Sequence, residues 1–234
     1  MPLGLFMKKS IKVGLLAVMS LLAFIKSPAQ AELIFRGGYL VKILSTSGGY
    51  NEFLKERYGS TSPQLSGTAL SVAFISWRSR WGIGLEMDDL SGSINYKTLN
   101  GDQQQNKMKL KNSLLFLSFF PRSTPNLEFD LGYGSGKLTR EFYGYQSPNI
   151  VTSTISGQVG TQESSTTSSN MMMQVLYRLF GQKFRLDAGA RYSVSKHKIP
   201  EDDLRPGYDT KGVPTSMNFD LGGFGLIGTF TIRF

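Results

Sequence analysis

Apolar and polar residues alternate with a period of two in several segments of the chain, which predicts β-strands. In the clearest segment, 127–134, the apolar positions are Leu127, Phe129, Leu131 and Tyr133, and the alternate positions are Glu128, Asp130, Gly132 and Gly134. Because successive side chains of a strand point to opposite faces, one face of this strand is apolar and the other is charged or small.

Eight segments of this kind are separated by turn signals, at about 33–43, 67–77, 81–88, 107–120, 127–134, 168–179, 184–194 and 217–234. A soluble lipocalin-like barrel has its apolar face inside and its charged face outside. Here we expect the reverse, with the apolar face outside and the face of charged and small residues inside. Strands that face lipid must close into a ring, so that no backbone group is left unpaired. We therefore predict an all-β fold, a transmembrane antiparallel up-and-down β-barrel of eight strands.

The connections between these segments alternate between short and long. Short turns are expected near residues 79, 123 and 182, and long connections at 45–66, 95–106, 143–167 and 198–215. Membrane-spanning barrels keep short turns on the periplasmic side and four long loops outside, so both termini are expected in the periplasm. The fourth segment is apolar on both faces at 114–117, and there we expect Lys107, Lys109 and Lys111 to point inward.

The predicted inner face carries charges of both signs: Arg36, Lys42, Glu86, Asp88, Glu128, Asp130, Arg178, Arg185, Asp187, Arg191 and Arg233. The interior of an eight-stranded barrel is just filled by side chains, and unpaired buried charges are costly. We expect an ion-paired lumen, with Glu128 against Arg178 or Arg185 and Asp187 against Arg191. Inward glycines at 82, 84, 132, 134 and 189 are expected to make room for these groups.

Aromatic residues gather where the strands meet the short turns, at Trp77, Trp81, Phe119, Phe120, Tyr177, Phe180, Phe184 and Phe234. Amphipathic rings favour the depth of the lipid headgroups. We expect these residues at the periplasmic interface.

The start of the chain has the features of a secretory signal peptide. Lys8, Lys9 and Lys12 precede an apolar run at 13–25, and Ala29-Gln30-Ala31 fits a cleavage site. The run is shorter than the ~20 residues of a transmembrane helix. We predict a signal peptide over 1–31 and one barrel domain over 32–234. The sequence does not decide between Met1 and Met7 as the first residue of translation.

Composition narrows the function classes. The formal charge is +9, but four of the 26 Lys and Arg lie in 1–31, which leaves 22 against 17 acidic residues and a net charge of +5. This balance and export argue against nucleic-acid partners. The chain has no cysteine, hence no disulfide, thiolate chemistry or lipidation site. It also lacks a glycine-rich phosphate loop in the right context, so no cofactor is expected.

Candidate chemistry is sparse. His197 is the only histidine, and Ser195 shares its face two residues away, with Glu201 nearby as a possible orienting group. A serine-histidine lipid A hydrolase and a solvated histidine at a loop mouth are the two interpretations, and we expect no catalytic residue. The acidic run 201–203 is interpreted as loop charge rather than a metal site.

The long connections are candidates for a surface that binds an unidentified ligand. The connection at 147–169 is rich in Ser, Thr and Gly, and that at 50–58 mixes aromatic and charged residues. Near the predicted outer rim, Lys97, Lys107, Lys109 and Arg140 are candidates for pairing with lipopolysaccharide phosphates.

The chain ends on an alternating strand whose outer face includes Phe230, Ile232 and Phe234, and 187–192 has the sequence Asp-Ala-Gly-Ala-Arg-Tyr. In these features it resembles the small eight-stranded bacterial outer-membrane barrels of the OmpA and OmpX type, within the porin family. The resemblance implies a Gram-negative outer-membrane location, contact with lipid and lipopolysaccharide, and a monomer. It also implies that the terminal residues form a recognition signal for the barrel assembly machinery, which receives the chain from periplasmic chaperones.

Members of that superfamily include structural proteins, adhesins, channels and a few lipid A modifying enzymes. Our leading hypothesis is a non-enzymatic barrel that contributes to the cell envelope or to surface interactions. A narrow channel for small or hydrophobic solutes is the alternative, and a lipid A modifying enzyme is the remote one.

Overall fold

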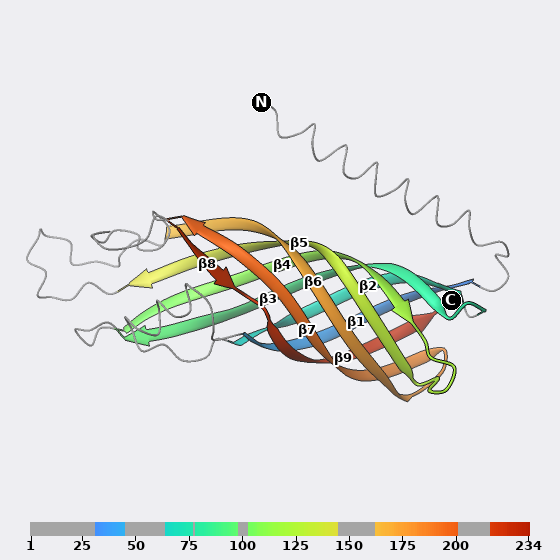
Figure 1. The fold of residues 1–234 in the computed structure, drawn as a ribbon. Helices are drawn as coiled ribbons and strands as arrows, with labels where there is room; N and C mark the ends of the chain where they lie inside the picture. The colour runs from blue at the N-terminus through green and yellow to red at the C-terminus, as the bar shows by residue number, and fades with distance from the viewer. Residues whose placement is uncertain (1–30, 45–63, 77, 98–102, 145–161, 201–215) are drawn as a thin grey trace, which may run out of the picture.

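The computed structural model describes residues 31–44, 64–76, 78–97, 103–144, 162–200 and 216–234. The predicted signal peptide lies outside these residues, except for Ala31. The strands are β1 (Ala31–Leu44), β2 (Gln64–Ser76), β3 (Trp81–Lys97), β4 (Gln103–Phe119), β5 (Leu127–Gly144), β6 (Gln162–Phe180), β7 (Phe184–Pro200), β8 (Ser216–Asp220) and β9 (Gly223–Arg233) (Figure 1). Among the described residues, no helix is long and apolar enough to cross a membrane.

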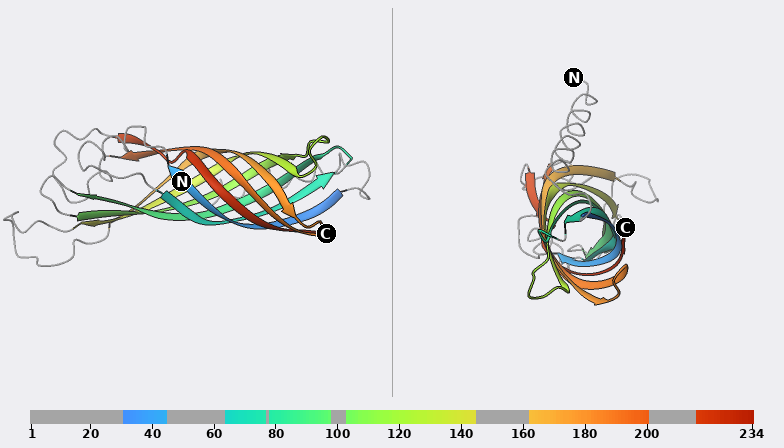
Figure 2. Two further views of the ribbon diagram at one scale, coloured as in Figure 1. Left: turned by 90° about the horizontal axis from the view of Figure 1, so that it is seen from below. Right: turned by 90° about the vertical axis from the view of Figure 1, so that its right-hand side faces the viewer.

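The strands form one closed sheet. Sequential neighbours pair antiparallel from β1 to β7, and the ring closes where β9 pairs with both β7 and β1. Viewed along its axis, the sheet is a complete ring (Figure 2). β8 and β9 act as one strand, because both keep the same register against β7, with Asp220 opposite Lys196 and Gly223 opposite Ser193. The predicted eight-stranded antiparallel barrel is therefore confirmed.

The last strand is interrupted at Leu221 and Gly222. The amide of Gly222 donates to Oδ1 of Asp220 at 2.7 Å, which turns the backbone, while the amide of Leu221 still donates to the carbonyl of Ser195 at 2.8 Å. Gly223 has φ +149°, and a Cβ there would lie 2.1 Å from the carbonyl oxygen of Ile43. A glycine is required at this close approach, and β8 beyond it pairs only with β7.

The short connections all lie at the end of the barrel where the chain enters β1 and leaves β9 (Figure 1). In the turn between β6 and β7, Gly181 adopts φ +88°, and a Cβ would meet the carbonyl oxygen of Phe184 at 1.8 Å. This end is called the turn end below, and the opposite end the loop end.

At the loop end, all four predicted connections were too wide, and two of them clearly so: β6 already begins at Gln162, inside the predicted 143–167, and most of 95–106 is strand. β3 and β4 continue to Lys97 and Gln103, which pair with each other, so the connection is only 98–102 rather than 95–106. Polar residues such as Asn95 and Gln105 read as a loop in the sequence, yet they extend the ladder. The connections 45–63, 145–161 and 201–215 lie outside the described residues.

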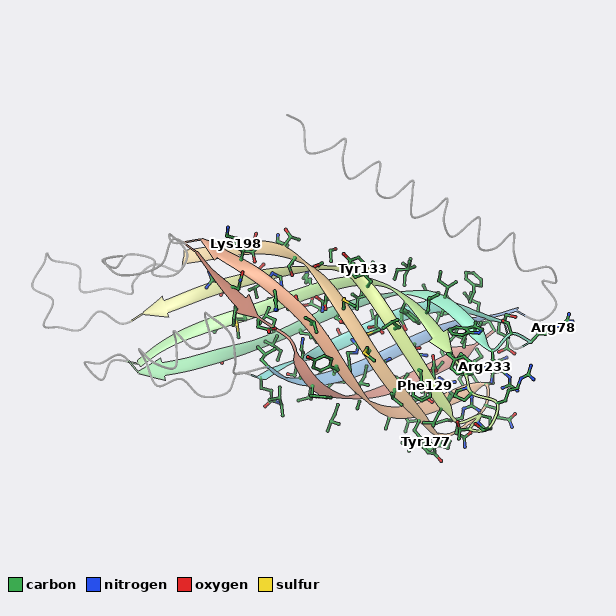
Figure 3. All side chains as sticks on the ribbon, in the orientation of Figure 1. Arg78, Phe129, Tyr133, Tyr177, Lys198 and Arg233 are labelled. Carbon is green, nitrogen blue, oxygen red and sulfur yellow. The ribbon has the colours of Figure 1, made fainter. Side chains whose placement is uncertain are left out.

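The outer wall near the turn end is an apolar band. Its exposed members include Phe35, Leu70, Leu85, Leu115, Leu131, Tyr133, Met173, Val175, Leu226 and Phe230. Phe129, Tyr133 and Tyr177 are labelled on this part of the barrel in Figure 3, between Arg78 and Arg233 near the turn end and Lys198 toward the loop end. β1 to β7 have 13 to 19 residues each, more than the ~9–11 that cross a membrane, so the loop end extends beyond the band.

The expected inward direction of Lys107, Lys109 and Lys111 was wrong. All three are exposed on the outer wall, and the inner face of β4 carries Leu110 and Phe116, which are buried in the lumen. The register follows from the period of two: one alignment of β4 buries its large apolar residues inside, and the lysines then point outward.

The aromatic residues at the turn end divide between the two faces. Trp81 and Phe119 are exposed on the outer wall, with ring centroids 4.8 Å apart. Phe234 is also exposed there, and its ring contacts that of Phe35 edge to face. Phe120 was wrongly expected at the lipid interface; it is buried with Ile34 and Ile75 inside the barrel. Trp77 lies outside the described residues.

Charge introduced into the apolar band is expected to destabilise the barrel according to depth. Leu131→Arg places a guanidinium amid the band and is expected to lower the free energy of unfolding in vesicles by about 2–4 kcal/mol. Ser135→Arg, two outward positions nearer the loop end on β5, is the matched control, with an expected loss of about 0–1 kcal/mol. Equal losses in urea unfolding would contradict a lipid-facing band.

Candidate functional site

The lumen contains the densest set of charged residues in the described structure. Nearer the turn end, Arg36 on β1 pairs with Glu128 on β5, and its Nη1 lies 3.2 Å from Oδ2 of Asp130. Arg185 on β7 pairs with the same Glu128 at 2.5 Å and with Asp187 at 2.7 Å. All five side chains are almost completely buried, so this cluster links strands from both sides of the barrel.

Hydroxyl groups add hydrogen bonds to two of these carboxylates. Ser118 donates to Oδ1 of Asp130 at 2.6 Å, and Thr231 donates to Oδ2 of Asp187 at 3.1 Å. Buried charges are tolerated when they are both paired and hydrogen-bonded. Ser118 and Thr231 were not identified in the sequence, where a serine or threonine on an inner face carries no distinguishing signal.

A second cluster surrounds Arg191 on β7. Its Nη2 lies 2.7 Å from Oε1 of Glu86, and its Nη1 donates to both oxygens of Asp88 at 3.0 and 3.1 Å. Asn112 on β4 donates to Asp88 at 3.2 Å. The contact with Glu86 is a charge pair and not an aligned hydrogen bond.

Gln174 on β6 connects the two clusters. Its Nε2 donates to Asp130 at 2.9 Å, and its Oε1 accepts from Nε and Nη2 of Arg191 at 2.8 and 2.6 Å. An amide suits this position because it donates to a carboxylate on one side and accepts from a guanidinium on the other. Gln174 was not identified as a candidate from the sequence, because a single glutamine on a strand gives no signal for this role.

Some expected pairs are not those that form. Asp187 contacts Arg185 rather than Arg191, because Arg191 reaches across the lumen to β3. Arg178 lies at a register shift between β6 and β7, is half-buried, and forms no ion pair with any described residue. Arg233 lies at the turn end, where its Nη2 is 2.6 Å from Oε2 of Glu32. Lys42 is buried in the lumen.

Four of the five expected inward glycines lie next to apolar side chains rather than charges, and the atoms nearest to Gly134 are backbone. A Cβ at Gly84 would lie 2.6 Å from the ring of Phe116, and one at Gly132 would lie 2.9 Å from Cε of Met172. Phe116 and Met172 form a buried cluster with Ala73 and Leu114. Large apolar side chains therefore fill the lumen opposite the positions without side chains.

Apolar residues also close the lumen on both sides of the charged clusters. Ile34, Ile75 and Phe120 lie at the turn end. Toward the loop end, the buried residues include Leu44, Leu65, Leu90, Met108, Leu110, Leu138, Phe219 and Leu221. The charged clusters thus lie between two apolar layers.

His197 and Ser195 do meet, at the loop end of the lumen. Nε2 of His197 lies 2.9 Å from Oγ of Ser195 and 3.1 Å from Oγ of Ser168, and Nδ1 lies 3.0 Å from Oγ1 of Thr166. His197 and Ser195 are fully buried, so no substrate reaches them in this arrangement. Nδ1 faces a hydroxyl and not a carboxylate, and Glu201 lies outside the described residues together with the acidic run 201–203.

The other candidate residues lie on different faces. Phe230, Ile232 and Phe234 are on the outer wall, where Phe230 and Phe234 are strongly exposed. Of the residues considered for lipopolysaccharide, Lys107 and Lys109 are exposed outside, whereas Arg140 was misplaced, since it is buried on the lumen side. The side chain of Lys97 is outside the described set.

Comparison with known proteins rests on structure alone. No family model matches the sequence, and no curated protein matches it. Among solved structures, Ail of Yersinia pestis has a TM-score of 0.50 at 13% identity, covering 88% of this chain and 99% of Ail, in a complex with the heparin analogue sucrose octasulfate. Free Ail has the same TM-score at 14% identity and the same coverage.

OprG of Pseudomonas aeruginosa has a TM-score of 0.45 at 15% identity, covering 87% of this chain and 96% of OprG. The likeness to Ail is one of fold. With the closed ring described above, it identifies this chain's architecture as that of the small eight-stranded outer-membrane barrels.

Removal of the arginine between Glu86 and Asp88 is expected to leave two buried carboxylates without their partner. Arg191→Met should therefore lower the free energy of unfolding by about 3–5 kcal/mol. Arg233→Met breaks the more exposed pair with Glu32 and should cost about 0–1 kcal/mol. Urea unfolding of both variants in the same vesicles measures the difference, and similar losses would show that the buried cluster adds nothing beyond a surface pair.

Proposed function

We propose that this protein is a non-enzymatic, integral outer-membrane β-barrel that contributes to the cell envelope or to surface interactions and does not conduct. The observation that supports this most is the filling of the lumen. Two ion-paired clusters joined by Gln174 lie between apolar layers, and their side chains are buried. A conducting lumen would leave charged side chains in contact with water.

The orientation follows from the asymmetry of the connections. Short turns face the periplasm in bacterial barrels, so the turn end, with both ends of the barrel domain, is assigned to the periplasm. The loop end, which extends beyond the apolar band, is then assigned to the cell exterior. The connections there are the candidate surface for an unidentified ligand.

Phe230, Ile232 and Phe234 are proposed as the signal that the barrel assembly machinery recognises. They share the outer face of the strand that closes the ring against β1. Recognition of the closing strand would keep its edge covered until β1 is available, which avoids an exposed sheet edge. Cleavage after Ala31, delivery by periplasmic chaperones and a monomeric state belong to the same proposal.

The two alternatives differ in what the lumen must do. A narrow channel requires the lumen to open, and a lipid A modifying enzyme requires substrate to reach Ser195 and His197. The buried pairs and the full burial of both residues argue against each of them.

Planar-bilayer recording tests the closed lumen. The folded protein is expected to add no discrete current steps above the protein-free bilayer, because the central pairs fill the cross-section. Folding is verified separately by the heat-dependent shift in gel migration typical of barrels.

Glu128→Ala serves as the comparison, since it removes the carboxylate shared by Arg36 and Arg185. Discrete openings in the wild type whose size changes in Glu128→Ala would contradict the proposal and support the channel.

A further inference from the structure

A groove of about 600 Å³ lies on the outer wall of the barrel, across β3, β4 and β5. Its cationic lining consists of Lys107, Lys109, Lys111 and Lys137, and Ser91 and Thr139 add hydroxyl groups. These six residues are called the lysine groove. All its lysines are exposed, and none belongs to the lumen clusters.

The groove lies directly above the apolar band. In the registered rows across β3, β4 and β5, the row Leu85, Leu115 and Tyr133 is apolar and exposed, and the row Asp89, Lys111 and Lys137 follows four residues further along the strands. Four residues span about 13 Å along a strand, and less along the membrane normal because barrel strands are tilted by about 40°. The lysines are therefore at the depth of headgroups and not of acyl chains.

The groove carries a net positive charge, because four lysines stand against two carboxylates: Glu141, which belongs to the lining and lies opposite Lys107, and Asp89 beside it. Asp89 lies between two of the lysines, with Oδ2 at 3.5 Å from Nζ of Lys109 and 3.7 Å from Nζ of Lys111. Lys137 forms no ion pair with any residue in the described ranges, although it lies directly opposite Lys111. Like charges in directly opposed positions destabilise a sheet unless an anion lies between them.

We propose that the lysine groove binds the phosphate groups of lipid A in the outer leaflet. Lipid A carries phosphates at the boundary between its acyl chains and its sugars, so its acyl chains would lie on the apolar band while a phosphate enters the groove. Lysine ammonium groups form charge-assisted hydrogen bonds with phosphate, and Ser91 and Thr139 supply further donors. The site rests on the proposed function, because it requires the loop end to face outward.

Asp89 competes with a bound phosphate, because it already contacts Lys109 and Lys111. Its contacts with Lys109 and Lys111 are exposed and long, and such surface pairs contribute little. A phosphate displaces the carboxylate from these lysines when it binds.

The test measures the dissociation constant of purified lipid A carrying both phosphates, by titration of the folded full chain in detergent micelles. The double variant Lys111→Gln and Lys137→Gln is expected to bind about 25-fold more weakly, at about fivefold for each lysine near an anionic surface. The matched control is Lys196→Gln with Lys198→Gln, which removes the same charge from exposed positions on β7 and should stay within about twofold. Asp89→Asn is expected to bind more tightly, by about two- to fivefold.

Three outcomes would overturn the proposal. Dephosphorylated lipid A binding as tightly as the phosphorylated form would remove the phosphate from recognition. Equal weakening in the control pair would show a general charge effect. Loss of heparin or inorganic phosphate binding in the groove variant, with lipid A binding intact, would assign the groove to a soluble anion.

Heat-dependent migration and insertion into phosphatidylcholine vesicles report the barrel and its membrane location independently of the groove. Failure of these readouts would contradict the proposed function, whereas failure of the titration alone contradicts only the lipid A site.

Discussion

The requirement that every backbone amide and carbonyl inside a membrane has a partner within the protein governs this structure. In hydrocarbon no water replaces a missing hydrogen bond, so a sheet is viable only when its first and last strands meet. Here the meeting strands are β1 and β9, paired from Ile34 opposite Arg233 to Leu44 opposite Gly223. The ring in turn separates two environments, and the period of two along each strand distributes side chains between them.

Closure at eight strands leaves a lumen that side chains fill, and this accounts for its chemistry. Arginines reach across the lumen because their planar heads bind carboxylates on distant strands: Arg36 meets Glu128 and Asp130 on β5, and Arg191 meets Glu86 and Asp88 on β3. Glycines such as Gly84 and Gly132 lie beside large apolar side chains on the neighbouring strands, which gives those side chains room in the lumen. The same filling that stabilises the ring argues against an open pore, which connects the fold to the proposed envelope role.

The fold was predictable because the alternation survives in nearly every strand. The prediction of side-chain direction failed on β4. Both faces of this strand are apolar at Leu114 and Leu115, and the charge of the nearby lysines wrongly indicated that they point into the lumen. The predicted length of the connection at 95–106 was also wrong. Polar residues can continue the paired strands beyond the membrane as readily as they can form a loop. Partners within the lumen were the least predictable part. The alternation along β7 places Asp187 and Arg191 on the same face. It does not show which arginine reaches which carboxylate, because that depends on the curvature of the ring. Gln174 likewise carries no sequence signal for joining two clusters.

The central claim is that, in the segment 127–134 of β5, odd-numbered positions face acyl chains while even-numbered positions face a filled lumen. The chain has no cysteine, so single cysteines placed in turn at 127–134 and labelled with a fluorophore report each position separately. Quenching by lipids with spin labels on their acyl chains should alternate, strong at 127, 129, 131 and 133 and weak at 128, 130, 132 and 134. Uniform quenching along the segment, or strong quenching at odd positions by a water-soluble quencher, would contradict the account.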